Sequence, residues 1–339
     1  MSQNIKLKDV AGLANVSVAS VSRYLNNPMI LREETRVKIQ KALQQTDYTP
    51  NRVAAGLRTK KTHTIALIIP GLSNLYYVDM CSAVHDSVSS RDYCVNLYMT
   101  EGNNDLLLRY LNELPSRLYD GAIICHLDDD DVTLGVLESV QRSMPMVLLT
   151  ASPDRMQFNN VIVDVFDGVK KATEHLIEIG KNQIAFVAGS DTVANAEKIK
   201  GFKAGLLGAG IEIDPNMIIN SQSNNFMGGY FAMRKFMESG TLPDGIVCAT
   251  DDIAIGCLKQ CHNNKLKLPE DIAIIGFNGI ALLDTYQPSI SSVYQPMQAI
   301  ANALSTILFE SINSGSSRKQ TRLFSCELIQ RESTTPKNG

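Results

Sequence analysis

The chain has 339 residues, of which 44% are apolar and 20% are charged. This length favours two or three domains, and the composition is typical of a globular protein with a sizeable core. No run approaches 18 uninterrupted apolar residues, which argues against a membrane-spanning helix, and the amino terminus lacks the apolar segment of a secretory signal. The seven cysteines are odd in number and thinly spread, so we expect no disulfide framework and a cytoplasmic location.

Charge is unevenly distributed along the chain. Residues 1–62 hold eleven Lys or Arg and four Asp or Glu, a net charge of +7, whereas the other 277 residues hold 21 and 31, a net charge of −10. A basic segment attached to an acidic body suggests that only the segment meets a polyanion such as nucleic acid. Small surface domains can also be basic by chance, so charge alone leaves the partner open.

The basic segment predicts three short helices, at 7–13, 18–25 and 33–45, from apolar spacing and helix-end signals. Ser17 is expected to cap the second helix, because its hydroxyl can accept a hydrogen bond from a free backbone N–H. The side chains expected to face inward are apolar: Val10, Leu13, Ala14, Val21, Leu25, Val37, Ile39 and Leu43.

Two short helices joined by a tight turn describe a helix-turn-helix, whose second helix enters the major groove of DNA. The outward face of the second helix is small and polar and carries Arg23, which suits a bidentate contact to guanine. Ser20 and Ser22 could reach phosphates or bases. A generic three-helix bundle with a solvated arginine fits the same periodicity equally well.

Residues 5–26, IKLKDVAGLANVSVASVSRYLN, resemble the amino-terminal signature of the lactose-repressor (LacI) family of transcription regulators, and residues 48–59, YTPNRVAAGLRT, resemble the hinge of that family. The resemblance implies a regulator that binds double-stranded DNA. The residues that it implies for DNA contact are Leu7, Ser17, Val18, Ala19, Ser20, Ser22, Arg23, Asn26, Asn51, Arg52, Ala54 and Leu57.

The residues of the hinge segment also suit a short helix on physical grounds. Pro50 suits the first position of a helix with Thr49 as its cap, and Val53, Ala54 and Leu57 would form one apolar face. So short a helix is marginal alone and would order against a partner. The resemblance implies that it folds on operator binding and that Leu57 wedges into the minor groove. A flexible linker is the interpretation that the bare sequence favours.

From residue 64 onward, apolar runs typical of buried parallel strands alternate with helical stretches, which predicts a doubly wound α/β architecture. The expected strands are 64–69, 94–99, 121–125, 146–150, 161–164, 184–188, 217–221, 246–249 and 272–277. Helices are expected between them, for example at 169–179, 198–207, 230–238 and 252–263. Nine strands exceed one typical sheet, so two subdomains are expected.

The second half of this region carries further resemblance to the same family, in residues 173–180, 184–189, 249–256, 268–277 and 327–334. The resemblance implies a helix-turn-helix domain at 1–48, a hinge at 49–62 and a two-lobed, periplasmic-binding-protein-like domain at 63–339. Lobe 1 would comprise about 63–162 and 293–323, and lobe 2 about 163–292 and 324–335. The crossings between the lobes are expected near 161–165, 289–294 and 322–326.

In open α/β sheets, ligands bind just past the carboxyl ends of the strands. The side chains expected to bind an effector follow predicted strands or match the family's ligand positions, and they are Ser73, Asn74, Tyr76, Tyr77, His126, Thr150, Lys198, Asn224, Thr250, Asp251 and Asn278. Adjacent Tyr76 and Tyr77 could stack on a flat ligand or sugar ring. Packing at the start of a helix explains either tyrosine equally well.

Four of these positions depart from the pattern of many sugar-binding family members. Thr150 stands where they carry an acid, Lys198 where they carry Arg, Asn278 where they carry Asp, and Asn224 where they often carry an aromatic residue. The changes remove acceptors for sugar hydroxyls and leave a cation. A sugar acid or a sugar phosphate is therefore favoured over a neutral sugar, unless Lys198 merely replaces the arginine and the ligand contacts lie elsewhere.

Signals for other chemistry are weak. Cys257 and Cys261 have helical spacing but no second pair nearby, so packing explains them better than a metal. The run 128–131 lacks calcium-loop spacing, Gly228-Gly229 lacks a dinucleotide-binding context, and Gly189-Ser190-Asp191 lacks the second glycine of a nucleophile elbow. No cofactor, no metal and no catalytic activity are therefore expected.

These observations predict a homodimeric regulator, expected to be a repressor of carbohydrate-metabolism genes, that binds a palindromic operator and is controlled by a small metabolite between its lobes. The alternative is a periplasmic-type sugar-binding protein without DNA function, against which the basic segment argues. A sugar-processing enzyme is a second alternative. The sequence does not name the effector, the operator or the direction of control.

Overall fold

The computed structural model describes residues 5–46, 48, 61–116, 119–125, 131–152, 157–314 and 318–335. The chain divides into two compact units, Met1–Thr62 and His63–Gly339, which we call the head and the body. The expected hinge helix falls on residues 49–60, outside the described residues. No helix in the described part of the chain is both long and apolar enough to cross a membrane.

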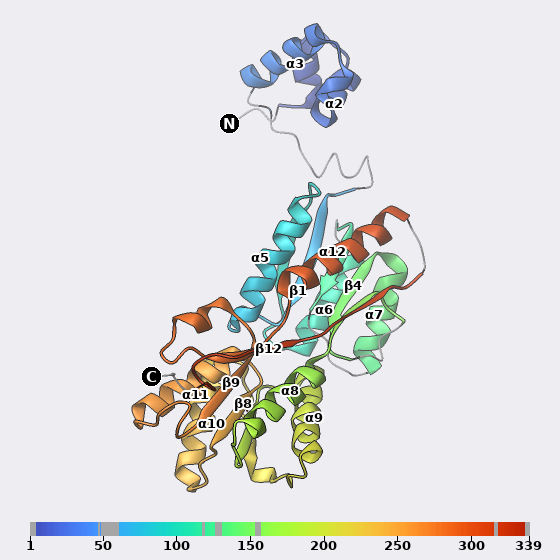
Figure 1. Ribbon diagram of the computed structural model, residues 1–339. Helices are drawn as coiled ribbons and strands as arrows, with labels where there is room; N and C mark the ends of the chain where they lie inside the picture. Colours follow the sequence, from blue (N-terminus) through green and yellow to red (C-terminus); the bar gives the residue numbers. More distant parts are fainter. Residues whose placement is uncertain are drawn as a thin grey trace. The chain divides into compact units, whose positions relative to one another are not determined.

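The head consists of helices α1 (Leu7–Leu13), α2 (Val18–Asn26) and α3 (Glu33–Thr46), with a short 3-10 turn at Pro28–Ile30 (Figure 1). The predicted cap of α2 is confirmed, because the Ser20 N–H donates to Ser17 Oγ at 3.0 Å. At the start of α1, the Lys6 N–H donates to the Asp9 carboxylate at 2.8 Å. Local hydrogen bonds thus fix where the first two helices begin.

The core of the head is small. Its buried apolar side chains, each at most 5% exposed, are Val10, Ala11, Ala14, Val21, Ile39 and Ala42. The prediction that Leu13 and Val37 face inward is wrong, since their exposed fractions are 54% and 45%. The buried side chains of α1 and α3 are instead Val10, Ala11, Ile39 and Ala42, which belong to one apolar cluster.

The described residues of the body form two six-stranded sheets (Figure 1). The first sheet has the order β11-β5-β4-β3-β1-β2, all parallel, and comprises β1 (Thr64–Ile69), β2 (Cys94–Met99), β3 (Gly121–Ile124), β4 (Met146–Thr150), β5 (Asn160–Val163) and β11 (Thr321–Phe324). The second has the order β12-β10-β9-β8-β6-β7 and comprises β6 (Ile184–Ala188), β7 (Ile218–Asn220), β8 (Gly245–Cys248), β9 (Ala273–Asn278), β10 (Ser291–Tyr294) and β12 (Glu327–Ile329). In this second sheet, β12 runs antiparallel to its neighbour and the other described strands pair in parallel. The predicted α/β class with two subdomains is confirmed.

Helices cover the sheets of both subdomains. Those of the first sheet, here called lobe 1, are α5 (Leu75–Ser89), α6 (Asn104–Glu113), α7 (Asp131–Ser143) and α12 (Met297–Ser314). Those of the second sheet, here called lobe 2, are α8 (Val165–Glu178), α9 (Val193–Gly208), α10 (Phe226–Ser239) and α11 (Asp251–Asn263). Helix α12 packs on α5 and on strands of lobe 1, although it follows a strand of lobe 2 in the sequence.

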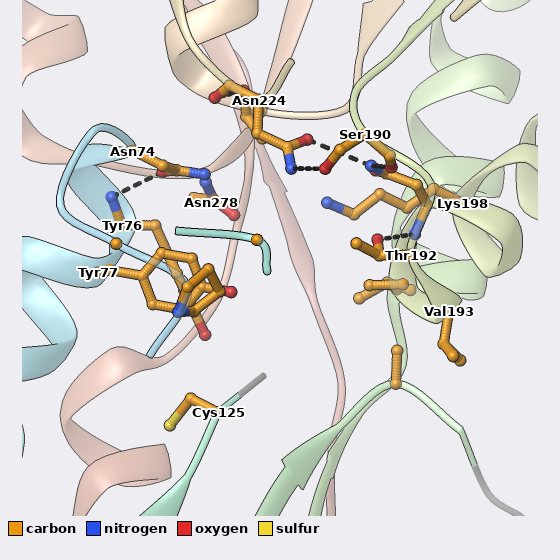
Figure 2. Close-up of a pocket in the computed structure, with 18 of the residues that line it drawn as sticks. Asn74, Tyr76, Tyr77, Cys125, Ser190, Thr192, Val193, Lys198, Asn224 and Asn278 are labelled. Carbon is orange, nitrogen blue, oxygen red and sulfur yellow. Dashed lines mark hydrogen bonds between the residues drawn. The ribbon is translucent and has the colours of Figure 1, made fainter. Parts of the chain in front are cut away.

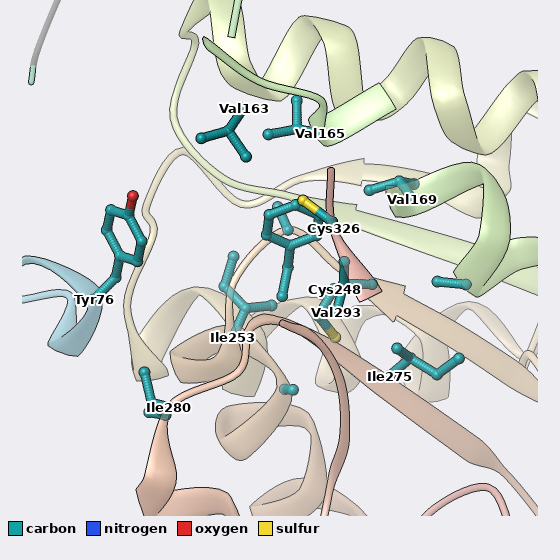
Figure 3. Close-up of a cluster of buried hydrophobic side chains, with 14 of the residues drawn as sticks. Tyr76, Val163, Val165, Val169, Cys248, Ile253, Ile275, Ile280, Val293 and Cys326 are labelled. Carbon is teal, nitrogen blue, oxygen red and sulfur yellow. The ribbon is translucent and has the colours of Figure 1, made fainter. Parts of the chain in front are cut away.

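The chain crosses between the lobes three times, after β5, after β10 and after β11. The sequence placed the second crossing at 289–294, but these residues contain β10 of lobe 2, so the crossing follows at 295–296. Strands β10, β11 and β12 were not predicted, because β10 begins with two serines and because β11 and β12 are edge strands whose side chains are mostly exposed or half-buried. An apolar cluster that includes Val163, Val293 and Cys326 fills the space around the crossings (Figure 3).

Two helix pairs of lobe 2 pack through glycine. A Cβ atom on Gly201 of α9 would lie 2.2 Å from the carbonyl oxygen of Phe166 on α8. A Cβ atom on Gly229 of α10 would lie 1.9 Å from the carbonyl oxygen of Ile253 on α11. These contacts bring backbone against backbone, so that a larger residue at either glycine would force the paired helices apart.

Candidate functional site

A cleft of about 420 Å³ lies between the lobes of the body (Figure 2). Nine of the expected effector-binding residues line it: Ser73, Asn74, Tyr76, Tyr77, Thr150, Lys198, Asn224, Thr250 and Asn278. His126 lies outside the described residues, and Asp251 does not line the cleft. The carboxyl ends of strands from both sheets therefore meet at one polar cavity, which is the arrangement expected for a ligand site in α/β proteins.

The start of α5 forms the wall of the cleft in lobe 1. Asn74 caps this helix, since its Oδ1 accepts a hydrogen bond from the Tyr76 N–H at 3.0 Å. The rings of Tyr76 and Tyr77 meet edge to face, with centroids 5.1 Å apart. Burial raises the pKa of both phenols, so the wall offers neutral hydroxyls and aromatic surface.

A hydrogen-bonded set of side chains forms the opposite wall, in lobe 2. Asn195 Nδ2 donates to the Ser190 carbonyl at 2.6 Å and to Asn224 Oδ1 at 3.2 Å, and Asn224 Nδ2 donates to Ser190 Oγ at 2.7 Å. Gly189 makes room for this set, because a Cβ atom there would lie 1.7 Å from Asn224 Oδ1. The three amide and hydroxyl groups hold one another in fixed positions at the edge of the cavity.

Sequence reasoning missed Ser190 and Asn195 as lining residues. Ser190 follows β6 closely, so the same rule that selected residues after other strands could have found it. Asn195 lies in the first turn of α9, which Thr192 caps by accepting the Asn195 N–H at 3.2 Å. Its position becomes visible only when α9 is known to begin at Val193 rather than near Lys198.

Lys198 brings a buried cation to this cleft. Its side chain is 6% exposed, and Nζ donates to the Ala249 carbonyl at 2.6 Å and lies 3.9 Å from the centre of the Phe277 ring. Burial lowers the pKa of Lys198 to about 8, against weaker opposing effects of Cys326 and Asp251. The amine is therefore still mostly protonated at neutral pH.

The ammonium group of Lys198 lacks a carboxylate partner within the described part of the chain. None of the ion pairs among the described residues includes it. A carbonyl and a ring face compensate a buried cation only in part. The site can therefore accept an anionic group of a ligand.

Asn278 and Gln295 line the cleft where β9 and β10 end. Gln295 Nε2 donates to Asn278 Oδ1 at 2.9 Å, and the Tyr76 hydroxyl donates to Gln295 Oε1 at 3.3 Å. Asn278 has a φ of 125°, and within the described part of the structure its Nδ2 has no hydrogen-bond partner. Gln295 was not predicted, because β10, which precedes it, was not predicted. These side chains connect lobe 1 to lobe 2 through the second crossing.

Thr250 and Asp251 are adjacent but have different roles. Thr250 lines the cleft and caps α11, with Oγ1 accepting the Ile253 N–H at 3.2 Å. Asp251 points into lobe 2, where its carboxylate accepts the Ile280 N–H at 2.9 Å and the Ser292 hydroxyl at 2.5 Å. Burial raises the pKa of Asp251 to about 6. The expectation that it contacts the effector is corrected, since its side chain joins the loop after β9 to β10.

The cysteine signal in α11 can be compared with the structure, whereas most of the run 128–131 lies outside the described residues. Cys257 and Cys261 are fully buried in α11, which agrees with the packing role assigned to them. In the described ranges, no group of three or more His, Cys, Asp or Glu side chains is placed to hold a metal.

In the head, α2 presents a solvent-facing surface. Ser17, Val18, Ala19 and Arg23 are exposed, and Ser20 and Ser22 are half-buried. Leu7 is half-buried and packs against the core of the head. The side chain of Asn26, and all of Asn51, Arg52, Ala54 and Leu57, lie outside what the structure describes.

A helix-turn-helix head with an exposed second helix, followed by a two-lobed body with a polar cleft, defines a DNA-binding regulator with a ligand-binding domain. Comparison with known families agrees with this class. Residues 6–51 match the model of bacterial regulatory proteins of the lacI family, and residues 173–334 match a periplasmic binding protein-like domain.

Individual proteins match over nearly the whole chain. Catabolite control protein A of Priestia megaterium is 31% identical over 313 residues, which cover 91% of this chain and 93% of that protein. The probable HTH-type transcriptional repressor ExuR of Bacillus subtilis is 30% identical over 334 residues, covering 97% and 98%. The structure of the Lac repressor dimer bound to operator and an anti-inducer has the same fold, with a TM-score of 0.87 and 24% identity over 98% of this chain and 99% of that one.

The chain therefore belongs to the lacI family of bacterial regulatory proteins. It is a DNA-binding transcriptional regulator, and its second part is a periplasmic-binding-protein-like domain.

Proposed function

We propose that this regulator is a homodimeric repressor of carbohydrate-metabolism genes whose effector is a small anionic sugar derivative, a sugar acid or a sugar phosphate. Each head reads one half-site of a palindromic operator, and the effector binds in the cleft between the lobes. Movement of the lobes changes how the two bodies meet and so couples the two sites. Such coupling is typically worth about 1–3 kcal/mol.

The buried cation of Lys198 is the observation that carries the effector class. It lines the cleft at 6% exposure with a carbonyl and an aromatic ring as contacts. A carboxylate or phosphate would complete its coordination, and the hydroxyl and amide groups of the lobe 2 wall suit the sugar part of such a ligand.

The exposed face of α2 supports the DNA-binding half of the proposal. Val18 and Ala19 have small exposed side chains, which allow the helix to approach base edges, and the exposed Arg23 can reach them. We assign the sequence-specific contact to Arg23 and place Ser17, Ser20 and Ser22 near phosphates or bases. Leu57 and the other hinge residues retain their expected role in the minor groove.

An exposed edge of lobe 1 supports the homodimer. Strand β2 has only one neighbour among the described strands of its sheet, and Leu97 and Met99 on it are 40% and 38% exposed. Val78 on α5 is 43% exposed. An uncovered edge strand with apolar side chains tends to be covered by another chain. Sedimentation of the purified protein tests this assignment, and a monomer at micromolar concentration would contradict it.

The effector is tested by measuring thermal unfolding of the protein with matched sets of neutral sugars, sugar acids and sugar phosphates. We expect the anionic ligands to raise the unfolding temperature most, and Lys198→Ala to abolish that shift. Lys200→Ala is the matched control, because Lys200 lies two residues further on α9, pairs with Glu197 at 2.6 Å and does not line the cleft. A preference for neutral sugars, or full binding by Lys198→Ala, would refute the anionic effector.

The operator is tested by selecting duplexes from a random-sequence library with the purified protein and measuring their affinity by fluorescence anisotropy. We expect a palindromic sequence, and a log Kd that depends linearly on log salt because phosphate contacts release counterions. Recovery of no preferred sequence would refute a sequence-specific repressor.

A further inference from the structure

A second concave surface lies in lobe 1, apart from the effector cleft. It is a groove between the end of α5, the last two turns of α12 and the start of β11, with a volume of about 990 Å³. Four of its lining residues are cations: Arg91, Arg318, Lys319 and Arg322. Among the described lining residues Glu310 is the one acid, and its Oε2 accepts a hydrogen bond from Gln320 at 2.7 Å.

The base of this basic groove is rigid. The Arg91 guanidinium lies 5.0 Å from the centre of the Phe309 ring and donates to the Ser87 carbonyl at 2.7 Å. This arrangement holds Arg91 at the end of α5. The other three cations follow α12 and lead into β11, and all three are exposed.

The excess of positive charge in the groove contrasts with the rest of the body. Residues 63–339 carry a net charge of −10, yet this groove combines four cations with one acid among its described residues. A local reversal of charge on an acidic domain creates a positive potential that attracts anions selectively. With a volume of about 990 Å³, the groove is large enough to hold part of an extended polyanion.

The groove adjoins the first residue of the body. The His63 ring lies 4.9 Å from the Tyr93 ring, and the Tyr93 ring lies 4.8 Å from the Phe309 ring at the base of the groove. The parallel strands of lobe 1 begin at this end of the sheet, β1 just after His63 and β11 within the groove. The chain therefore enters the body from the head beside the groove.

The covalent connection keeps DNA bound to the head within reach of this end. Fourteen residues, 49–62, join Tyr48 to His63, and a chain of that length spans at most about 50 Å even when fully extended. DNA carries one negative charge for about every 1.7 Å of its axis, so a duplex held by the head brings many phosphates into this range.

We propose that the basic groove of lobe 1 is a second DNA-binding surface, which contacts the phosphate backbone of the duplex held by the heads. This role rests on the proposed operator binding and adds to it. The groove contributes affinity without sequence information, because phosphate contacts position a protein but do not specify bases. The body is then a direct DNA ligand as well as the sensor of the effector.

The test uses the full-length protein with the neutralising substitutions Arg318→Gln, Lys319→Gln and Arg322→Gln combined. Arg91 is left in place because it also packs on Phe309. The probes are the duplex selected by the wild-type protein and a random-sequence duplex of the same length. We expect affinity at about 0.1 M salt to fall roughly tenfold or more for both duplexes. The slope of log Kd against log salt should decrease by about 0.9 for each phosphate that the variant no longer neutralises.

The matched control removes three exposed lysines from lobe 2, with Lys203→Gln, Lys235→Gln and Lys259→Gln, and should leave the slope unchanged. The single substitution Arg322→Glu repeats the test with minimal risk to folding, and unfolding temperatures verify that each variant is folded. The inference is overturned if the groove variant keeps the wild-type affinity and slope. It is also overturned if the lobe 2 control loses as much affinity and slope as the groove variant. Failure of the wild-type protein to select any sequence instead overturns the proposed operator binding.

Discussion

The head and the body present opposite kinds of binding surface. The head offers exposed side chains on α2 above a core of six buried apolar residues. The candidate site of the body includes buried polar side chains such as Asn74, Lys198, Thr250 and Asn278, each less than one-tenth exposed and held by hydrogen bonds.

The difference in exposure between the two surfaces determines whether a substitution there changes binding alone or both binding and the stability of the fold. A change on an exposed face alters binding and leaves the fold nearly untouched. A change in a buried polar site alters both, because a desolvated group that awaits its ligand lowers the stability of the empty protein. Ligand binding in the body therefore removes a cost that the empty fold carries, whereas a surface such as that of α2 carries no comparable cost when it is empty.

The largest effect is expected where two helices of the body pack backbone against backbone. Gly229→Ala should destabilise the body by about 3 kcal/mol or more, because the new Cβ atom would lie 1.9 Å from the Ile253 carbonyl and two helices would have to separate. Gly12→Ala in α1 is the comparison in the head, where nothing lies within 4 Å of the added atom, and it should stabilise the head by about 0.5–1 kcal/mol. Calorimetric unfolding measures both, and similar effects in the two regions would contradict the contrast.

The next effect concerns the buried cation. The pKa of Lys198 in the folded body is about 8, below its ordinary value of 10.5, so the unfolded chain binds this proton more tightly. The body is therefore most stable, with respect to this group, above pH 10.5, and that stability declines as the pH falls from 10.5 to 8. Lys198→Met should stabilise the empty body by about 1–3 kcal/mol at pH 7.

Unfolding measured in denaturant at pH 7 and at pH 10 checks this sign, since the advantage of the variant should shrink at the higher pH. Affinity of the wild-type protein for an anionic effector should also decline above pH 8, as the amine loses its proton. A variant less stable than wild type at pH 7, or with an advantage independent of pH, would show that the buried charge is not the cause.

On the exposed face of the head, Arg23→Ala should weaken operator binding by about 1–3 kcal/mol and relax preference at one base pair. The unfolding temperature of the head should not change, because the side chain is exposed. Arg32→Ala is the control, since this exposed residue lies outside α2 and the base preference should survive its removal. Fluorescence anisotropy with a set of operators that each differ at one base pair measures the affinity and the base preference. Unchanged preference in Arg23→Ala would remove the assigned contact.

The smallest effect is expected at the cap of α2. Ser17→Ala should destabilise the head by about 1 kcal/mol through removal of the hydrogen bond from the Ser20 N–H, whereas Ser17→Gly should cost only a few tenths of that amount. Thermal unfolding monitored by circular dichroism measures the loss of stability in each of the two variants. Equal destabilisation by both variants would mean that the cap contributes little.

The sequence by itself determined the features that depend on near neighbours. The helices of the head, the cap at Ser17 and the long strands of the body follow from periodicity and end signals within a few residues. Seven of the expected effector residues line the cleft because they follow parallel strands whose carboxyl ends meet at one edge, whereas Lys198 and Asn224 were expected from the resemblance to the family.

Only the tertiary structure decided the rest. Gln295 lines the site because the four-residue strand β10 lies beside β9. Asp251 does not line it, because its side chain turns toward the loop after β9. Leu13 proved exposed because the other helices of the head cover the face of α1 that carries Val10 and Ala11. Such outcomes depend on which distant segments pack together, and a periodic pattern carries no information about the partner against which a face is buried.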